Sequence, residues 1–344
     1  MTKLKLRMRT FLSVLILLFM AVNITACGDD TPTSEQAAES ESEQTEEKEE
    51  IEHEKVIKVE DGTMSENSTV IAVGQTPVTY AEYKTYYYFM QNQYDELLGD
   101  KVWKQSSTSD KTIGQEAIED VLRMIIQVKV ICKVAVAEGI TLEADEKEDA
   151  DYNAQKLCES LDEKTKTDAM ITPQLMMTVF EENRLAEKVY NIKTGTQDVV
   201  GSVSDATAYR VLLLYKEAGD NRDQTKQEIE KLQQKISTSK KSFYYFARKE
   251  SDLDEVETVI GSLDERNNLW MQVMSMKNNV VSPVVEEKDG FYIVEVVEKP
   301  NDEINTEYRN KVVTEKQTAA FQKLYEEWSR RFDVDVSESL LADR

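Results

Sequence analysis

Hydrophobic residues in the first half of the chain recur at steps of three and four residues, which is the period of amphipathic helices. Thr79-Tyr80-Ala81-Glu82 has the spacing of a capping box, in which the first and fourth side chains satisfy backbone donors at the start of a helix. Helices are predicted at 80 to about 98, 118 to a C-cap at Gly139, 143 to about 161, and from Thr172-Pro173 to about 191. With a short strand at 70–73, they predict a helical domain over residues 69–200.

The pattern changes after residues 194–205, a Gly, Ser, Thr and Asp stretch that is typical of a linker. Strands are then predicted at 209–215, 280–285 and 291–297, and helices at 223–236, 242–250 and 267–276, an order close to βααβαββ. Asp289-Gly290 is a hairpin turn signal between the last two strands. We therefore expect an α+β domain over residues 204–300, followed by a long amphipathic helix within residues 301–344.

The beginning of the chain has the order of an export signal. Basic residues precede an apolar run at 11–22, which is shorter than the roughly twenty residues that span a bilayer. Ile24-Thr25-Ala26-Cys27 follows and resembles a bacterial lipobox. The sequence thus predicts a signal peptide over residues 1–26, diacylglycerol on the Cys27 sulfur, and a lipid-anchored protein on the extracytoplasmic face of the cell membrane.

Residues 27–68 are rich in Glu, Ser, Asp and Thr and are predicted to form a disordered acidic tether. His53, the one histidine of the chain, lies there and is interpreted as incidental. The formal net charge of −24 argues against nucleic acid and against electrostatic adhesion to anionic lipid, because both need clustered Lys and Arg. Membrane contact is expected through the lipid on Cys27.

Candidate chemistry is sparse. Cys132 and Cys158 each lie within an apolar helical pattern, so two buried thiols are expected, with a disulfide as the alternative that an exported location permits. No CxxC pair or Cys/His cluster suggests zinc, and the motifs of serine hydrolases, phosphate loops and zinc proteases are missing. We therefore predict neither a metal nor a cofactor.

Four sequence elements carry a resemblance to one known family: Val70-Ile71-Ala72-Val73-Gly74 with Val78-Thr79-Tyr80-Ala81-Glu82-Tyr83, Phe243-Tyr244-Tyr245-Phe246-Ala247 with Ser251-Asp252, Gly261-Ser262-Leu263-Asp264, and Val281-Ser282-Pro283-Val284 with Gly290-Phe291-Tyr292-Ile293-Val294. The first is similar to the opening of a helical chaperone domain. The others resemble F-x-x-L-A and S-D elements, a G-D-L-G turn and the closing strand pair of a parvulin-type domain. The chain thus resembles foldases of the PrsA and SurA type, which carry a parvulin-type (PpiC-like) peptidyl-prolyl isomerase domain.

This resemblance implies a helical body that residues 311–328 return to complete, with the isomerase domain as an insertion. Active parvulins place one histidine near the start of the first strand and another in the last, where this chain has Arg210 and Tyr292. The Met and Phe positions of the family's pocket map near Glu265 and Leu269, and its acidic or thiol position maps near Leu253 or Asp254. Met274 is a further pocket candidate. Since rotation about an X-Pro bond needs no nucleophile, loss of both histidines weakens the case for catalysis without excluding it, and Tyr292 could donate a hydrogen bond.

The resemblance implies a chaperone or foldase that binds unfolded or newly exported polypeptides. The candidate client contacts in the helical body are aromatic and methionine side chains: Tyr86, Tyr88, Phe89, Met176 and Met177. A core stripe is the other interpretation of the same pattern. An active prolyl isomerase and an envelope lipoprotein that binds one folded partner are the functional alternatives, and the sequence leaves open whether the chain forms a homodimer.

Overall fold

The computed structural model describes residues 53–99, 101–107, 111–195, 201–219 and 221–342, and the chain divides into two units. Unit 1 comprises residues up to Gly195 together with Thr318–Arg344, and unit 2 comprises Thr196–Gln317. The predicted signal peptide, Cys27 and most of the predicted tether lie outside the described residues. The mixture of helices and strands confirms the predicted α+β class.

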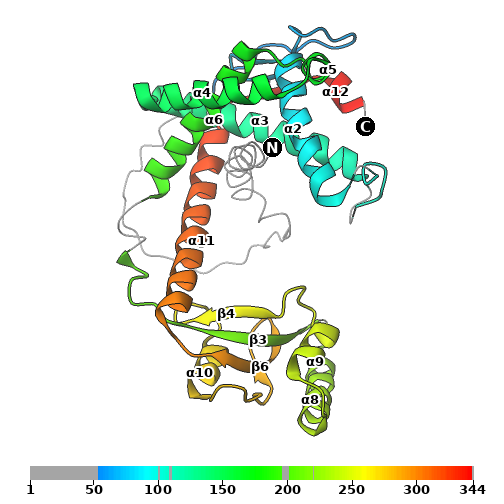
Figure 1. The fold of residues 1–344 in the computed structure, drawn as a ribbon, viewed down its shortest axis with the longest axis vertical. Helices are drawn as coiled ribbons and strands as arrows, with labels where there is room; N and C mark the ends of the chain where they lie inside the picture. The colour runs from blue at the N-terminus through cyan, green and yellow to red at the C-terminus, as the bar shows by residue number, and fades with distance from the viewer. Residues whose placement is uncertain (1–52, 100, 108–110, 196–200, 220, 343–344) are drawn as a thin grey trace, which may run out of the picture. The chain divides into compact units, whose positions relative to one another are not determined.

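Unit 1 is mainly helical (Figure 1). Its elements are β1 (Thr69–Val73), β2 (Thr76–Thr79), α2 (Tyr80–Leu98), α3 (Ile113–Ala137), α4 (Ala144–Ser160), α5 (Glu163–Asp168), α6 (Pro173–Thr194), β7 (Val334–Val336) and α12 (Glu338–Ala342). The helices predicted from periodicity are all present, whereas α5, β7 and α12 were not predicted. The unit also receives the last part of α11 (Asp302–Ser329).

Local capping explains where the main helices of unit 1 begin. The Thr79 Oγ1 accepts a hydrogen bond from the Glu82 N–H at 3.2 Å, as a cap should. The Glu82 side chain does not return to the backbone of Thr79, because it pairs with Lys129 instead. A complete capping box is found at α3, where Thr112 and Gln115 exchange hydrogen bonds. The predicted box at α2 is therefore half formed.

The small sheet of unit 1 joins distant parts of the chain. Its strand order is β2-β1-β7, and both pairings are antiparallel. Ile71 lies opposite Val336, so the C-terminal strand closes on the first strand of the unit. Phe321 and Trp328 of α11 belong to a buried cluster with residues of α3 and α6. The late segment therefore packs on the helical body, and within α11 the unit boundary falls between Gln317 and Thr318.

Residues 53–68 have defined contacts, which the predicted tether did not include. The Ile57 N–H donates to the Gly74 carbonyl at 3.1 Å, and the Glu60 N–H donates to the Thr69 carbonyl at 2.8 Å. Farther back, Glu54 exchanges backbone hydrogen bonds with the turn at Arg331 and Asp333. The acidic composition suggested disorder, but backbone pairing along β1 holds this part of the segment.

Unit 2 has the predicted order of elements. They are β3 (Ala208–Glu217), α8 (Arg222–Thr238), α9 (Phe243–Glu250), β4 (Glu257–Gly261), α10 (Asn267–Ser275), β5 (Val285–Glu286) and β6 (Gly290–Glu298). The strands form one antiparallel sheet in the order β4-β3-β6-β5. The strand expected at 280–285 is reduced to β5 and one bridge at Val281, since the Ser282 hydroxyl accepts the hydrogen bond from the Val294 N–H that a ladder carbonyl would take.

The two faces of this sheet are covered by different helices (Figure 1). Val211 and Leu213 of β3 share a buried cluster with Val294 of β6 and Leu269 and Val273 of α10. On the other face, the alternate residues of β3 and β6 pack against α8 and α9. The period of two along each strand thus separates the sheet into an α10 face and an α8–α9 face.

The first part of α11 belongs to unit 2, unlike the predicted boundary at residue 300. Ile304 and Tyr308 are buried with Ala208 and Val259 of the sheet edge. The Tyr308 hydroxyl donates to Asp264 Oδ1 at 2.9 Å and accepts from the Leu263 N–H at 3.0 Å. Apolar packing and these two hydrogen bonds extend the unit into α11.

Candidate functional site

The α10 face of unit 2 carries the main constellation of polar and aromatic groups around Tyr292. Tyr292 of β6 lies directly opposite Tyr215 of β3, and the two rings are 4.7 Å apart at 32°. The Arg266 guanidinium lies 5.4 Å from the centre of the Tyr292 ring. Leu253 packs against the same cluster, and Leu269 is fully buried within it. Five segments of unit 2 thus converge on one buried phenol.

The hydrogen of the Tyr292 hydroxyl is already engaged. It donates to Asp289 Oδ2 at 2.6 Å, a length typical of a charge-assisted hydrogen bond. The same carboxylate oxygen lies 3.5 Å from Arg266 Nε, and the Asp289 carbonyl accepts from the Tyr215 hydroxyl at 2.8 Å. A phenol has one hydrogen to donate, so in this geometry Tyr292 offers a ligand only an acceptor.

Burial raises the pKa of Tyr292 above its ordinary value, and the hydrogen bond to Asp289 raises it further. Burial also raises the pKa of Tyr215, with the Asp289 charge acting in the same direction. Both phenols therefore stay protonated at neutral pH.

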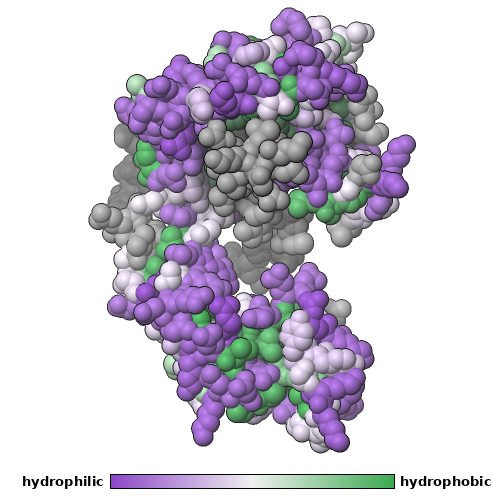
Figure 2. All heavy atoms as spheres, in the orientation of Figure 1, coloured by the Kyte–Doolittle hydropathy of each residue, from purple (hydrophilic) through white to green (hydrophobic). Residues whose placement is uncertain are grey.

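A second part of the α10 face has free polar tips. Tyr209 and Trp270 form an edge-to-face pair with ring centres 5.7 Å apart, and both rings are half-buried. In the part of the chain that the structure describes, no hydrogen-bond partner is found for the Tyr209 hydroxyl or the Trp270 Nε1. Met271 and Met274 of α10 are 59% and 49% exposed. Figure 2 shows patches of apolar surface among the polar side chains on the face turned to the viewer.

The residues expected to form one pocket are not all brought together. Arg210 projects from the opposite face of β3 and pairs with Glu307 of α11, with Nη2 and Oε2 2.7 Å apart. Asp254 is exposed, and its carbonyl accepts from Arg248. Leu269 reaches the Tyr292 cluster, whereas Met274 lies on the exposed side of α10. The position of Arg210 follows from the alternation of side chains along a strand. The odd-numbered residues of β3 share the face of Tyr292, namely Tyr209, Val211, Leu213 and Tyr215, so Arg210 projects from the other face.

Sequence reasoning missed Tyr215, Arg266 and Asp289 as members of this constellation. Asp289 was interpreted only as a turn residue. Its position three residues before Tyr292 in a tight hairpin was the available signal, because the hairpin folds the carboxylate back over the strand. Arg266 and Tyr215 are joined to the site only by tertiary structure.

Comparison with known proteins finds a family match within unit 2. Residues 211–298 match the family model described as Rotamase: PPIC-type PPIASE domain. This match confirms the resemblance inferred from the motifs, and the matched residues lie within unit 2. Around it, the chain is a helical body whose C-terminal part follows the inserted domain.

Several solved structures of foldases show a weak likeness to part of the chain. Peptidylprolyl isomerase PrsA from Bacillus anthracis is 17% identical, with 60% of this chain and 94% of that chain covered and a TM-score of 0.36. Foldase protein PrsA from Streptococcus pneumoniae is 18% identical, with 62% and 84% covered and a TM-score of 0.29. A SurA-like chaperone structure from Campylobacter jejuni is 15% identical, with 78% and 99% covered and a TM-score of 0.27. Among curated proteins, none matches.

The client contacts expected in the helical body lie mostly in its core. Tyr86, Phe89 and Met176 are 2%, 4% and 0% exposed. Tyr88 and Met177 are half-buried and pack against the cluster that contains Phe89 and Met176. The structure thus agrees with the core interpretation of this stripe, and the buried members are not available to a client in this conformation.

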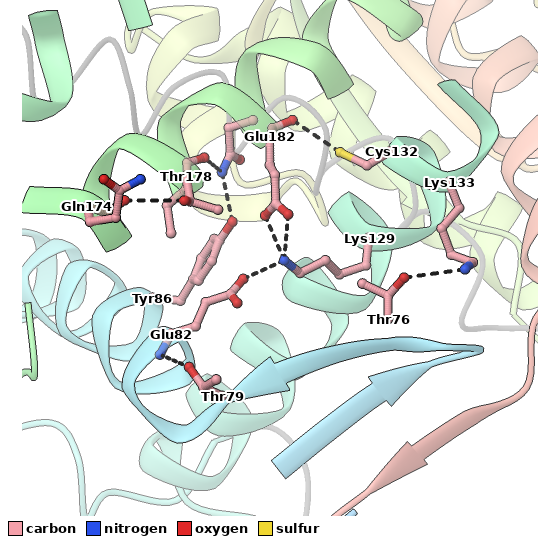
Figure 3. A network of polar contacts seen from close by, with 12 residues as sticks. Thr76, Thr79, Glu82, Tyr86, Lys129, Cys132, Lys133, Gln174, Thr178 and Glu182 are labelled. Carbon is pink, nitrogen blue, oxygen red and sulfur yellow. Dashed lines mark hydrogen bonds and ion pairs between the residues drawn. The ribbon is translucent and has the colours of Figure 1, made fainter. Parts of the chain in front are cut away.

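A buried charge cluster joins three helices of unit 1, as Figure 3 shows. Lys129 of α3 is 4% exposed, and its Nζ lies 2.8 Å from Glu82 of α2 and 2.7 Å from both carboxylate oxygens of Glu182 of α6. Beside it, the Tyr86 hydroxyl accepts a hydrogen bond from Asn183 Nδ2 at 2.8 Å. Burial raises the pKa of Glu82, against the opposing attraction of Lys129. We interpret this cluster as a structural link between helices.

The remaining candidate chemistry is limited. Cys132 and Cys158 are free thiols, and burial with the nearby Glu182 charge raises the pKa of Cys132 to about 12. Within the described ranges, no group of His, Cys, Asp and Glu side chains is arranged to hold a metal ion. Of the helices that the structure describes, none is both long and apolar enough to cross a bilayer.

Proposed function

We propose that this protein is a lipid-anchored extracytoplasmic foldase that binds unfolded, newly exported polypeptides and whose PPIC-type domain acts mainly as a binding module. The observation that carries the proposal is the match of residues 211–298 to a peptidyl-prolyl isomerase domain, together with a Tyr292 hydroxyl that is committed to Asp289. The family supplies the substrate class, and the closed hydrogen bond argues against strong catalysis.

The α10 face supports binding of extended polypeptide. The Tyr209 and Trp270 rings offer flat apolar surface with unpaired polar tips, and Met271 and Met274 add adaptable apolar side chains. Such a surface favours weak, sequence-tolerant contacts.

Retained isomerase activity is the second candidate, because lowering the barrier of an X-Pro bond requires only a dry pocket and suitable hydrogen bonds. The test measures cis-trans exchange of a short X-Pro peptide with the full chain and with Tyr292→Phe. We expect no acceleration by either protein. Acceleration that falls in Tyr292→Phe would show an isomerase that works without histidine and would overturn the binding-module proposal.

Chaperone activity is tested by aggregation of an unfolded client protein in the presence of the full chain. The Trp270→Ala variant should lose most of the protection, while Tyr152→Ala, which removes a ring that is 50% exposed in unit 1, should keep it. Equal protection by both variants would exclude the α10 face as the client surface. No protection by the parent chain would favour an envelope lipoprotein that binds one folded partner.

The lipid anchor is a separate part of the proposal and rests on the N-terminal sequence. Expression of the full chain with labelled fatty acid should label the parent and leave Cys27→Ser unlabelled. Label that survives in Cys27→Ser would contradict lipid attachment at this sulfur.

A further inference from the structure

One segment of unit 2 has a charge opposite to that of the chain. The net charge of the protein is −24, yet residues 231–249 contain no Asp or Glu. The basic residues of this segment are Lys231, Lys235, Lys240, Lys241, Arg248 and Lys249. The segment runs from the second half of α8 through the turn into α9. The clustering of Lys and Arg that the overall composition seemed to lack is therefore present locally.

Two of these cations lie near aromatic rings of α9, a helix that also exposes two tyrosines. Tyr244 and Tyr245 of α9 are 49% and 40% exposed. Lys241 Nζ lies 3.7 Å from the centre of the Tyr245 ring, and Lys235 Nζ lies 5.9 Å from the Phe246 ring. We call the surface formed by Lys231, Lys235, Lys240, Lys241, Tyr244 and Tyr245 the basic aromatic patch.

The lysines of this patch are not neutralised by neighbours. Across the described residues, none of Lys231, Lys235, Lys240 and Lys241 pairs with a carboxylate, whereas Lys249 pairs with Glu250 at 3.3 Å. The hydrogen bond from Lys241 lowers the pKa of Tyr245, with the charges of Lys241, Lys249 and Lys235 acting in the same direction. The charges of Lys235, Lys241 and Lys249 therefore act together at Tyr245, and no ion pair with a carboxylate among the described residues opposes the attraction of the patch lysines to an external anion.

We propose that the basic aromatic patch docks onto a membrane surface with anionic lipid headgroups. Lysines near such a surface are attracted to it, and tyrosine rings favour the headgroup level, where one end is apolar and the other is wet. The choice of a membrane rather than another anionic surface rests on the proposed lipid anchor, which would hold the chain at a bilayer. Docking here is peripheral, since α9 is a short helix with apolar residues facing the sheet.

The overall negative charge does not oppose this docking strongly. At physiological ionic strength the Debye length is about 8 Å, so acidic groups farther than this from the bilayer are largely screened. The acidic neighbours of the patch in sequence are Glu228 and Glu230 on α8, Glu250 at the end of α9, and Asp254 beyond it. Raising the salt concentration should therefore release the patch.

The experiment measures amide hydrogen exchange of the full chain on vesicles. One set contains phosphatidylglycerol with phosphatidylcholine, and the other contains phosphatidylcholine alone. We expect exchange in residues 243–250 to slow several-fold on the anionic vesicles only, and this protection to vanish when salt rises from about 0.1 M to about 1 M. Exchange in β3 and β6 should stay unchanged, which confirms that unit 2 is folded.

Charge-reversal variants complete the test. Lys235→Glu with Lys241→Glu should abolish the protection, while Lys277→Glu with Lys299→Glu, at exposed lysines of unit 2 outside the patch, should retain it. Absence of protection in the parent chain, equal protection on both vesicle types, or protection unaffected by Lys235→Glu with Lys241→Glu would overturn the proposal. Equal protection by soluble polyglutamate without vesicles would also overturn it, in favour of an acidic polypeptide partner.

The lipid anchor and the patch give separable results. A chain that does not stay on phosphatidylcholine vesicles contradicts the anchor, whereas protection on anionic vesicles reports the patch whether or not the anchor is present. An anchored chain without protection in residues 243–250 contradicts the patch alone.

Discussion

Replacement of Lys129 by methionine should severely destabilise unit 1. The methionine side chain has a similar length and no charge, so it removes the cation and keeps most of the packing. Glu82 and Glu182 would then face each other as two carboxylates without the ammonium that lies 2.7 to 2.8 Å from their oxygens. The change tests whether the charge cluster is energetically important.

The magnitude follows from burial. Lys129 is 4% exposed and Glu82 is 8% exposed, so neither charge is well solvated. Removing one partner of a buried ion pair costs about 3 to 5 kcal/mol, because the other charge is left uncompensated. Lys133 offers a matched control on the same helix: its partner Glu54 is 33% exposed, so Lys133→Met should cost only about 0 to 1 kcal/mol.

The destabilisation caused by Lys129→Met should also depend on pH. Burial raises the folded-state pKa of Glu82 above its unfolded value, and loss of Lys129 would raise it further. The stability contributed by such a group is complete below the unfolded pKa and is lost as pH rises through the folded pKa. The cost of Lys129→Met should therefore be largest at neutral pH and shrink on acidification.

Denaturant unfolding in a Trp270→Phe background measures this effect. Trp103 and Trp328 then report on unit 1 without a signal from unit 2. The second arm is Glu82→Gln, which leaves Lys129 with Glu182 as a balanced pair and should cost about 1 kcal/mol. In the double variant, the coupling should be about 1 to 3 kcal/mol. A cost of Lys129→Met below that of Lys133→Met, or one independent of pH, would refute the argument.

Three further predictions concern unit 2 and the titrating side chains. Gly261→Ala should destabilise unit 2 by about 1 to 3 kcal/mol in thermal unfolding, because the new Cβ would clash with the buried Tyr308 ring, while Gly201→Ala, with no atom within 4 Å, should be neutral. Alkaline titration followed by tyrosine absorbance should show Tyr292 ionising after the exposed tyrosines, because its folded-state pKa is raised. Its contribution to stability is complete below the usual tyrosine pKa and is lost as pH rises through the folded-state pKa. Tyr292→Phe should therefore remove a late step from the titration. In a Cys27→Ser chain, a thiol reagent at a pH of about 8 should react with Cys132 only after unfolding. The reason is that burial and, to a smaller extent, the Glu182 charge raise the pKa of Cys132 to about 12. Rapid reaction of Cys132 in the folded chain would contradict this prediction.

Much of the fold could be predicted because the main elements are specified locally. Apolar periodicity and caps such as Thr172-Pro173 determine the long helices of unit 1 without reference to distant residues. Elements that depend on partners were missed. β7 has three residues and exists through its pairing with β1. The predicted order of unit 2 included a strand at the place of β4 but assigned no residues to it, because Glu257 and Thr258 weaken its apolar signal.

The partners of Lys129 in the charge cluster also could not be predicted from the sequence. Lys129 stands within an apolar helical run, and a buried ammonium requires an anionic partner. That requirement is visible in the sequence, but the chain contains 66 Asp and Glu residues from which the partner must be chosen. Only the crossing of α2, α3 and α6 selects Glu82 and Glu182.

The candidate site was partly predicted for a comparable reason. The structure brings Tyr292 and Leu269 together, whereas Arg210, which the motif alignment placed in the same pocket, projects from the other face of β3. A shift of one residue along a strand exchanges its two faces, so a motif alignment that is uncertain by one position loses the pocket. The register of β3 against β6, which pairs Tyr215 with Tyr292, supplies the missing constraint.

Contact with a membrane likewise depends on the charge of one surface and not on the net charge of the chain. A net charge of −24 suggests repulsion from anionic lipid, and this inference treats the charge as if it acted from one point. Screening over about 8 Å makes the relevant quantity the charge of the surface that approaches the bilayer. For the basic aromatic patch that charge is positive, because residues 231–249 carry Lys and Arg without Asp or Glu. If hydrogen exchange confirms docking there, an acidic chain and an anionic membrane are compatible through a local reversal of charge.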